Sequence, residues 1–257
     1  MNPGRTLVIA TNVFREAIRD RVLYLIALFA IFMVMAIRLL PEIAATTEAK
    51  ITRDVGLGAM TLLGLLVAVF IGTGLVNKEI EKRTVLVLLA KPISRTEFIV
   101  GKHLGLSAVL AVLVAVMTAI YMALLSFSQI SYPVTSVLMS SIFLFLLLSL
   151  MTAVAIAFGV FTSSLLATLL TFTVFLMGSF SANLVALGAQ SKNPSIETIT
   201  RNLYLVLPDL SRLDLKNQAV YGLLPSTETL LLNALYAVLY IIVLLAIAIL
   251  VFSRREF

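Results

Sequence analysis

The chain has 257 residues, of which 61% are hydrophobic and 12% are charged, about half the charged fraction of a typical soluble domain. This composition excludes a soluble globular domain and, because the apolar segments do not alternate with polar residues, also a transmembrane barrel. The absence of cysteine and the single histidine exclude a disulfide framework, a thiolate nucleophile and a Cys/His metal site. The formal net charge of +6 comes from cations scattered at the ends of apolar segments, which indicates membrane topology and not nucleic-acid binding.

Residues 1–21 predict an amphipathic helix that lies along the membrane surface. Leu7, Val13 and Ala17 fall on one side at helical spacing, whereas Arg15 and Arg19 fall on the other. The charges also interrupt the stretch too early for a cleaved signal peptide. An ordinary extension close to the membrane is the alternative interpretation.

Six windows of about 20 mainly apolar residues, the length that crosses the hydrocarbon core of a bilayer, follow along the chain. They cover residues 22–40, 55–76, 104–125, 136–160, 164–188 and 230–252. With the N-terminus in the cytoplasm, twelve of the 19 Lys and Arg residues fall on the inner side, in agreement with the positive-inside rule. We therefore expect an all-α polytopic protein with six transmembrane helices, both termini cytoplasmic, and a single domain over residues 1–257.

Small and hydroxylated residues mark two of the spans. Three small residues repeat every four positions on the second span, which is the spacing of close helix contacts, within one chain or between two. The fifth span is the richest in hydroxyl groups and is the candidate lining of a pathway. The predicted pathway or dimer-interface positions are Gly64, Ala68, Gly72, Thr168, Thr171 and Asn183.

Residues 77–103 form a charged loop between the second and third spans. Its charged start is followed by an apolar run over residues 85–90 and then by Pro92, which cannot continue a helix. Ser94 and Glu97 have the spacing of a capping box, so a helix is expected to begin there. The apolar run predicts docking to another protein, because water penalises its exposure. A solvated positive-inside loop would explain the cations but not this run.

Residues 189–229 form a long loop on the outer side. An apolar stripe from Ser195 to Pro208 predicts a short amphipathic helix, a proline break and a further short element. Ser226 is the expected N-cap of the last span. A structural cap over the spans and a role in substrate release both fit this pattern.

The charged loop resembles the first cytoplasmic loop of ABC-2 type permeases. The nearest group includes the permease linked to maturation of multicopper enzymes, and residues 209–213 and 220–222 of the outer loop resemble that group as well. The six-span layout agrees, so the resemblance covers essentially the whole chain. The similar positions in the charged loop are Glu79, Glu81, Lys82, Arg83, Thr84, Leu88, Leu89, Lys91, Pro92, Arg95, Glu97, Gly101 and Lys102.

The resemblance implies an ABC-2 permease fold of the type V exporter kind, located in the inner (plasma) membrane. It implies that residues 79–90 form a coupling helix docked on a separate ABC ATPase subunit, which would hold ATP and Mg, and that a second permease copy completes the transporter. No cofactor, metal or catalytic residue is expected in this chain. Arg83 stands where many relatives carry a small residue. The implied ATPase contacts are Glu79, Glu81, Lys82, Arg83, Thr84, Leu88, Leu89, Pro92 and Arg95.

The sequence contains no G-x-x-x-x-G-K-[ST] phosphate loop, so ATP hydrolysis is expected on another chain. The expected function is a permease subunit that couples this hydrolysis to export of an unidentified substrate, with a lipidic or amphipathic cargo favoured over a small ion. The alternative is an ATP-driven subunit that transmits force to an extracytoplasmic partner without passing a solute. An ion-coupled carrier is a third hypothesis, and the absence of ionisable residues from spans two to six argues against it.

Overall fold

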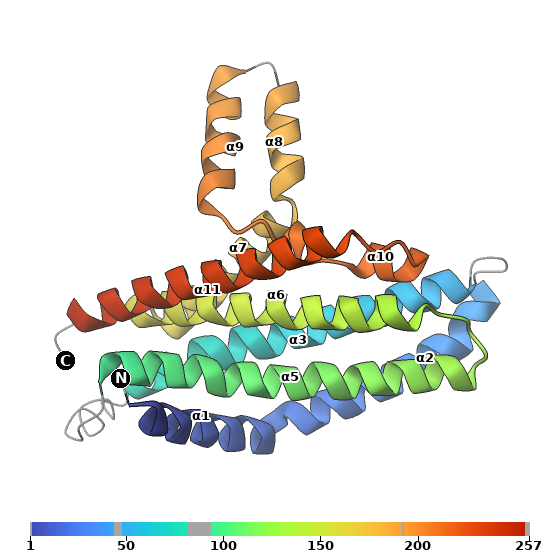
Figure 1. Cartoon of the computed structure of the whole chain (residues 1–257), viewed down its shortest axis with the longest axis horizontal. Coiled ribbons are helices and arrows are strands. Elements are labelled where there is room, and N and C mark those ends of the chain that lie inside the picture. Colours follow the sequence, from blue (N-terminus) through green and yellow to red (C-terminus); the bar gives the residue numbers. More distant parts are fainter. Residues whose placement is uncertain (1, 44–47, 82–93, 192, 255–257) are drawn as a thin grey trace.

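The computed structural model describes residues 2–43, 48–81, 94–191 and 193–254, and every regular element in them is helical. The five long helices lie side by side along one common direction (Figure 1). These are α2 (Leu23–Ile43), α3 (Glu48–Glu81), α5 (Arg95–Phe127), α6 (Val134–Phe161) and α11 (Thr227–Arg254). The shorter α-helices are α1 (Pro3–Ala17), α7 (Ser164–Ser179), α8 (Ser181–Gln190), α9 (Pro194–Val206) and α10 (Lys216–Tyr221).

Each long helix contains an apolar segment that is long enough to cross a membrane. The segments have mean hydropathies between 2.3 and 3.1. Helices of 28 to 34 residues are about 42 to 51 Å long, which exceeds the roughly 30 Å of hydrocarbon in a bilayer. The described part of the chain is therefore a multi-pass helical bundle with five candidate spans.

Helix α6 occupies the centre of the bundle and contacts α3, α5 and α11. In its spanning segment 78% of the residues are buried, compared with 11% in α2 and 22% in α11. The exposed residues of α2 and α11 are mostly large and apolar, as expected for surfaces that face lipid. The order of burial therefore places α6 in the core of the described bundle and α2 and α11 at its surface.

The continuous fifth span expected over residues 164–188 is not formed. Helix α7 ends at Ser179 after 16 residues, a length of about 24 Å, and α8 begins after a turn at Phe180. The outer loop meets α7 at this point, because a Cβ on Gly178 would lie 2.6 Å from the Pro208 carbonyl oxygen. The described helices thus do not confirm the expected count of six spans. The physical reason is that the loop around Pro208 packs against Gly178, where α7 ends.

Helices α8 and α9 form a hairpin that stands out from the bundle, across the direction of the long helices (Figure 1). The two helices meet at Gly188, where a Cβ would touch the Thr200 side chain. The hairpin presents Leu187, Ile199 and Val206 to the outside, each more than half exposed. The expected amphipathic helix of the outer loop, its break at Pro208 and the short elements that follow it are confirmed.

The expected N-terminal helix is present as α1, and a π-helical turn over Ile18–Val22 joins it to α2. Asn2 caps the helix through its side chain, which accepts a hydrogen bond from the Gly4 N–H at 3.0 Å. Buried Val13 and Ala17 lie on the face that packs against α5, and the two helices run alongside each other in Figure 1. The placement of α1 along the membrane surface stays a prediction.

Candidate functional site at the start of helix α5

The segment that the sequence marks for ATPase coupling lies between the end of α3 and the start of α5. Glu79 and Glu81 belong to the last turn of α3. Arg95 is the first residue of α5. The other predicted contacts, which are Lys82, Arg83, Thr84, Leu88, Leu89 and Pro92, lie outside the described residues.

A capping box fixes the first turn of α5, as the sequence predicted. The Ser94 hydroxyl accepts a hydrogen bond from the Glu97 N–H at 3.1 Å, and the Glu97 carboxylate accepts one from the Ser94 N–H at 3.0 Å. The other oxygen of this carboxylate accepts a hydrogen bond from the Asn2 N–H at 2.6 Å. One buried side chain therefore caps α5 and joins its first turn to the start of α1.

The same turn of α5 is joined to the last turn of α11. The Arg95 guanidinium donates hydrogen bonds to the carbonyl oxygens of Phe252, at 3.0 Å, and Ser253. A cation beside the last carbonyl groups of a helix also complements the negative end of the helix dipole. The rings of Phe98 and Phe252 stack with centroids 5.5 Å apart, and the Lys102 ammonium lies 4.9 Å from the Phe98 centroid. The start of α1 and the end of α11 thus both contact the first turn of α5.

Two glycines let α1 approach the first half of α5. A Cβ on Gly101 would lie 2.9 Å from the Ile9 side chain, and one on Gly105 would lie 2.6 Å from the carbonyl oxygen of Ala10. The second contact is with backbone, which cannot rotate away as a side chain can. Close packing of α1 on α5 therefore requires glycine at position 105.

We expect Gly105→Ala to lower the stability of the protein by about 1–3 kcal/mol, the usual effect of overpacking. Gly58→Ala is the matched control, because no atom lies within 4 Å of a Cβ placed there, and alanine improves helix propensity. Circular dichroism during heating measures the effect, since the chain contains no tryptophan to report by fluorescence. Equal melting temperatures for the two variants would contradict the close contact.

The small-residue stripe of α3 faces α6 in the described chain. A Cβ on Gly64 would lie 2.4 Å from the Leu148 side chain, and one on Gly72 would lie 2.9 Å from the Cβ of Ala155. Ala68, between them, is fully buried. The contact that this stripe makes here is within one chain, and its use as a pathway or a dimer interface stays a prediction.

One of the hydroxyl groups predicted to line a pathway on α7, that of Thr168, lies against the last third of α3. The side chains of Thr73 and Thr168 form a hydrogen bond at 3.1 Å. The buried Thr171 hydroxyl donates to the carbonyl oxygen of Ala167 at 2.7 Å, a bond internal to its own helix. Asn183 is exposed on α8 and is not brought together with the threonines.

The single histidine lies between α5 and α6. His103 is buried, and its Nε2 lies 3.1 Å from the carbonyl oxygen of Ser149. The hydroxyl of Ser149 in turn lies 3.0 Å from that of Ser107. No cluster of three or more His, Cys, Asp or Glu residues occurs among the described positions, so this histidine is part of a helix contact there.

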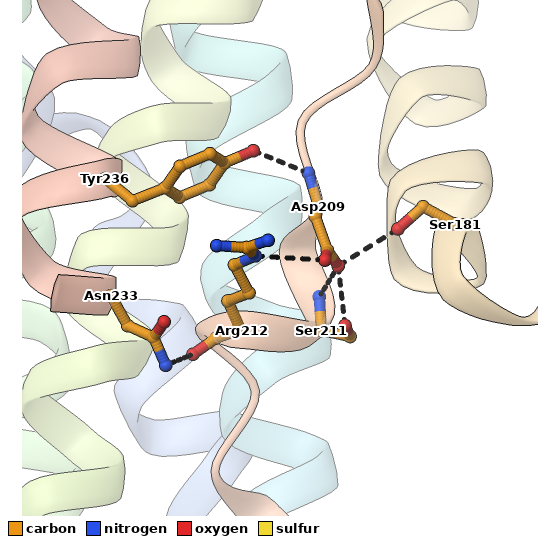
Figure 2. A network of polar contacts seen from close by, with 6 residues as sticks. All are labelled: Ser181, Asp209, Ser211, Arg212, Asn233 and Tyr236. Carbon is orange, nitrogen blue, oxygen red and sulfur yellow. Dashed lines mark hydrogen bonds and ion pairs between the residues drawn. The ribbon is translucent and has the colours of Figure 1, made fainter. Parts of the chain in front are cut away.

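A second polar network holds the outer loop to the bundle (Figure 2). The buried Asp209 carboxylate accepts hydrogen bonds from the Ser181 hydroxyl at 3.0 Å and the Arg212 Nε at 3.1 Å. It also accepts two from Ser211, through the N–H at 3.2 Å and the hydroxyl at 2.5 Å. A carboxylate that belongs to the loop thus fastens the start of α8, where the fifth predicted span is broken.

Helix α11 completes this network from the opposite side. The Tyr236 hydroxyl accepts a hydrogen bond from the Asp209 N–H at 2.8 Å, and the Asn233 amide donates to the carbonyl oxygen of Arg212 at 3.1 Å. The Arg212 guanidinium lies 5.0 Å from the centre of the Tyr236 ring. In Figure 2 the loop lies between α11 and α8 and contacts both. We call Ser181, Asp209, Ser211, Arg212, Asn233 and Tyr236 the outer clasp.

Burial alone would raise the pKa of Asp209, but the hydrogen bonds from Ser211, Arg212 and Ser181 hold it below the usual carboxyl range. A group whose pKa is lowered by folding adds stability above its unfolded pKa and loses it as pH falls through the folded pKa. We therefore expect the difference in melting temperature between the native protein and Asp209→Asn to be constant from pH 7 to 5. Below about pH 4, near the unfolded carboxyl pKa, the difference should shrink. A difference that grows on acidification would contradict this assignment.

The comparison with known protein families covers the residues of all these sites except Asn2. The family model described as "ABC-2 family transporter protein" matches residues 7–257, almost the entire chain. This chain belongs to the ABC-2 transporter family. No curated protein matches its sequence.

Family membership makes this ABC-2 permease a membrane subunit of an ABC transporter, a transport subunit that is not itself catalytic. The family also implies an ABC ATPase as partner and a membrane as surroundings. The ABC-2 resemblance of the charged loop is therefore confirmed, whereas the multicopper-maturation group stays a prediction.

Several residues that join these sites were not evident from the sequence of the permease. The pairing of Phe98 with Phe252 and the bonds of Ser181 and Tyr236 link segments that are far apart in the chain. The spacing of Gly101 and Gly105, four residues apart, is a recognisable signal for close helix packing. The other contacts have no comparable local signature, because each depends on a partner elsewhere in the fold.

Proposed function

We propose that this ABC-2 permease is driven by a separate ATPase that docks on residues 79–90 and that the pair exports a substrate. The observation that supports this proposal is the arrangement at the start of α5. Arg95 and Glu97 follow closely after the segment that would receive the ATPase. Glu97 forms a hydrogen bond with Asn2, and Arg95 forms one with the end of α11. A displacement of that segment would therefore act on α1, α5 and α11 together.

In this proposal a second permease copy completes the translocation pathway. Thr168 and Thr171 on α7, with Asn183 on α8, would line it. Gly64, Ala68 and Gly72 on α3 would contribute when α3 moves away from α6 during transport. The hydrogen bond between Thr73 and Thr168 supports a polar path next to α3. Hydroxyl groups in an otherwise apolar interior favour an amphipathic or lipidic cargo over a small ion.

The alternative function is transmission of force to a partner outside the membrane, without passage of a solute. The α8–α9 hairpin supports this alternative, because it stands out from the bundle and exposes Leu187, Ile199 and Val206. In either function both termini lie in the cytoplasm and the hairpin on the outer side of the inner membrane.

The orientation is tested by single cysteines, because the chain has none of its own. A cysteine at Ser253 should react with a maleimide that cannot cross membranes only after permeabilisation. A cysteine at Ser191, in the hairpin, should react in intact cells. The reverse pattern would overturn the proposed orientation.

Affinity purification of the tagged permease in mild detergent, followed by mass spectrometry, tests the proposed function. We expect an ATP-binding cassette subunit at about one copy per permease chain and ATP hydrolysis by the purified complex. Recovery of the permease alone in several detergents would overturn the coupling proposal. Capture of an extracytoplasmic protein through the hairpin, without ATP-dependent solute movement in vesicles, would favour force transmission.

A further inference from the structure

The junction between α1 and α2 contains an open groove of about 690 Å³. It lies where the chain passes through the π-helical turn and enters the first candidate span. Three apolar and three charged side chains line it, and they are Phe14, Arg15, Glu16, Ile18, Arg19 and Leu23. The groove therefore joins a charged helix to a membrane-spanning one.

The charged and apolar parts of this groove follow one another along the chain. Arg15, Arg19 and Leu23 follow one another at intervals of four residues through the end of α1, the π-helical turn and the start of α2, and all three line the groove. Both arginines are exposed, and among the described side chains no carboxylate forms an ion pair with either of them. Leu23 is 64% exposed and Tyr24 is 77% exposed. The cationic end of the groove thus leads directly onto the apolar surface of α2.

We propose that this groove binds the headgroup of an anionic phospholipid. Arg15 and Arg19 would hold the lipid phosphate, since guanidinium groups recognise phosphate oxygens through paired hydrogen bonds. One acyl chain would run past Leu23 and along the exposed apolar face of α2. Glu16 opposes the bound anion and limits its affinity.

The continuity of the groove with α2 selects a lipid over a soluble anion. A free phosphate would leave Phe14, Ile18 and Leu23 in contact with water, whereas a lipid covers them with its glycerol and acyl groups. The surface onto which the groove opens is largely unburied in the fold and belongs to a candidate span, so the bilayer surrounds it. Cations at the end of a span attract anionic headgroups, at about 1 kcal/mol for each Arg or Lys.

Binding at this place would act on the start of α5. The opposite face of α1 packs against Gly101 and Gly105, so a lipid held by Arg15 and Arg19 would restrain α1 against α5. The inference requires the membrane placement of α2 but not the docking of an ATPase. A failure of the lipid-binding proposal can therefore be distinguished from a failure of the ATPase-docking proposal.

The purified permease is titrated in detergent with phosphatidylglycerol or with phosphatidylcholine, and native mass spectrometry counts the lipids retained. We expect tighter retention of phosphatidylglycerol. Each arginine is expected to contribute about 1 kcal/mol, and 1.4 kcal/mol corresponds to a tenfold change in affinity. Arg15→Gln or Arg19→Gln should therefore weaken binding about fivefold, and the double variant about 25-fold. Glu16→Gln should change the affinity in the opposite direction, which a merely misfolded variant would not do.

Arg38→Gln is the matched control, because Arg38 lies toward the far end of α2, away from the groove. It should leave the affinity that depends on Arg15 and Arg19 unchanged. Equal retention of both lipids, or an equal effect of Arg38→Gln and Arg15→Gln, would overturn the proposal. Displacement of phosphatidylglycerol by millimolar inorganic phosphate would show a site for soluble anions and would also overturn it.

Discussion

Replacing Leu88 and Leu89 together by glutamate should release the ATPase from the permease. These two side chains are the expected anchors of the coupling segment, and a charge in an apolar docking cleft carries a desolvation penalty of several kcal/mol. We expect recovery of the ATPase with the tagged permease to fall by at least a hundredfold, the equivalent of about 3 kcal/mol. Co-purification from detergent, quantified against the permease band, measures the loss.

Leu88→Met with Leu89→Met is the control, since methionine keeps the apolar character and nearly the same volume. This variant should retain the ATPase. The glutamate variant should still insert into the membrane, because the exchanged residues lie outside the expected spans. Undiminished recovery of the ATPase with the glutamate variant would refute the assignment of residues 79–90 as the coupling helix.

Replacing Asp209 by alanine should open the outer clasp. The exchange removes the acceptor of four hydrogen bonds and leaves Arg212 and Ser181 without their carboxylate partner. The loss of such a network corresponds to about 3 kcal/mol, which lowers the melting temperature of a chain of this size by roughly 6–12 °C. Heating followed by size-exclusion chromatography in detergent measures the change.

Asp214→Ala is the matched control in the same loop. Asp214 pairs with Lys216 at 3.0 Å, but both side chains are about one-third exposed, at 39% and 34%. Solvent-exposed ion pairs contribute at most about 1 kcal/mol, so this variant should melt within a few degrees of the native protein. Similar decreases in melting temperature for Asp209→Ala and Asp214→Ala would mean that the outer clasp stabilises the protein no more than an exposed ion pair of the same loop does.

The outer clasp is also expected to hold the α8–α9 hairpin in place. If Asp209 holds the start of α8 through Ser181, its removal should increase proteolysis within residues 180–207 before the bundle unfolds. The same treatment should leave the junction of Arg95 with α11 unaffected, because the two sites share no residue. Together the two sites show how both ends of the bundle are fastened by contacts with α11.

Local patterns in the sequence predicted much of this permease. The length of the apolar windows identified a polytopic helical protein, because a bilayer demands about 20 such residues at a time. Ser94 with Glu97 marked the start of α5, and Pro208 marked the break after α9, because caps and prolines act on neighbouring backbone. The resemblance in the charged loop led to the right family.

Only the tertiary structure decided which segments meet. Residues 164–188 read as one apolar helix, yet the chain turns at Phe180, where the outer loop packs against Gly178. Arg95 bonds to Phe252, 157 positions away in the sequence. The small residues of α3 mark a close contact, and only the tertiary structure shows that this contact within the described chain is with α6. The spacing of small and apolar residues predicts that a helix face is buried but not which segment covers it. The reason is that a helix in lipid is stabilised by close van der Waals packing on any surface of matching shape.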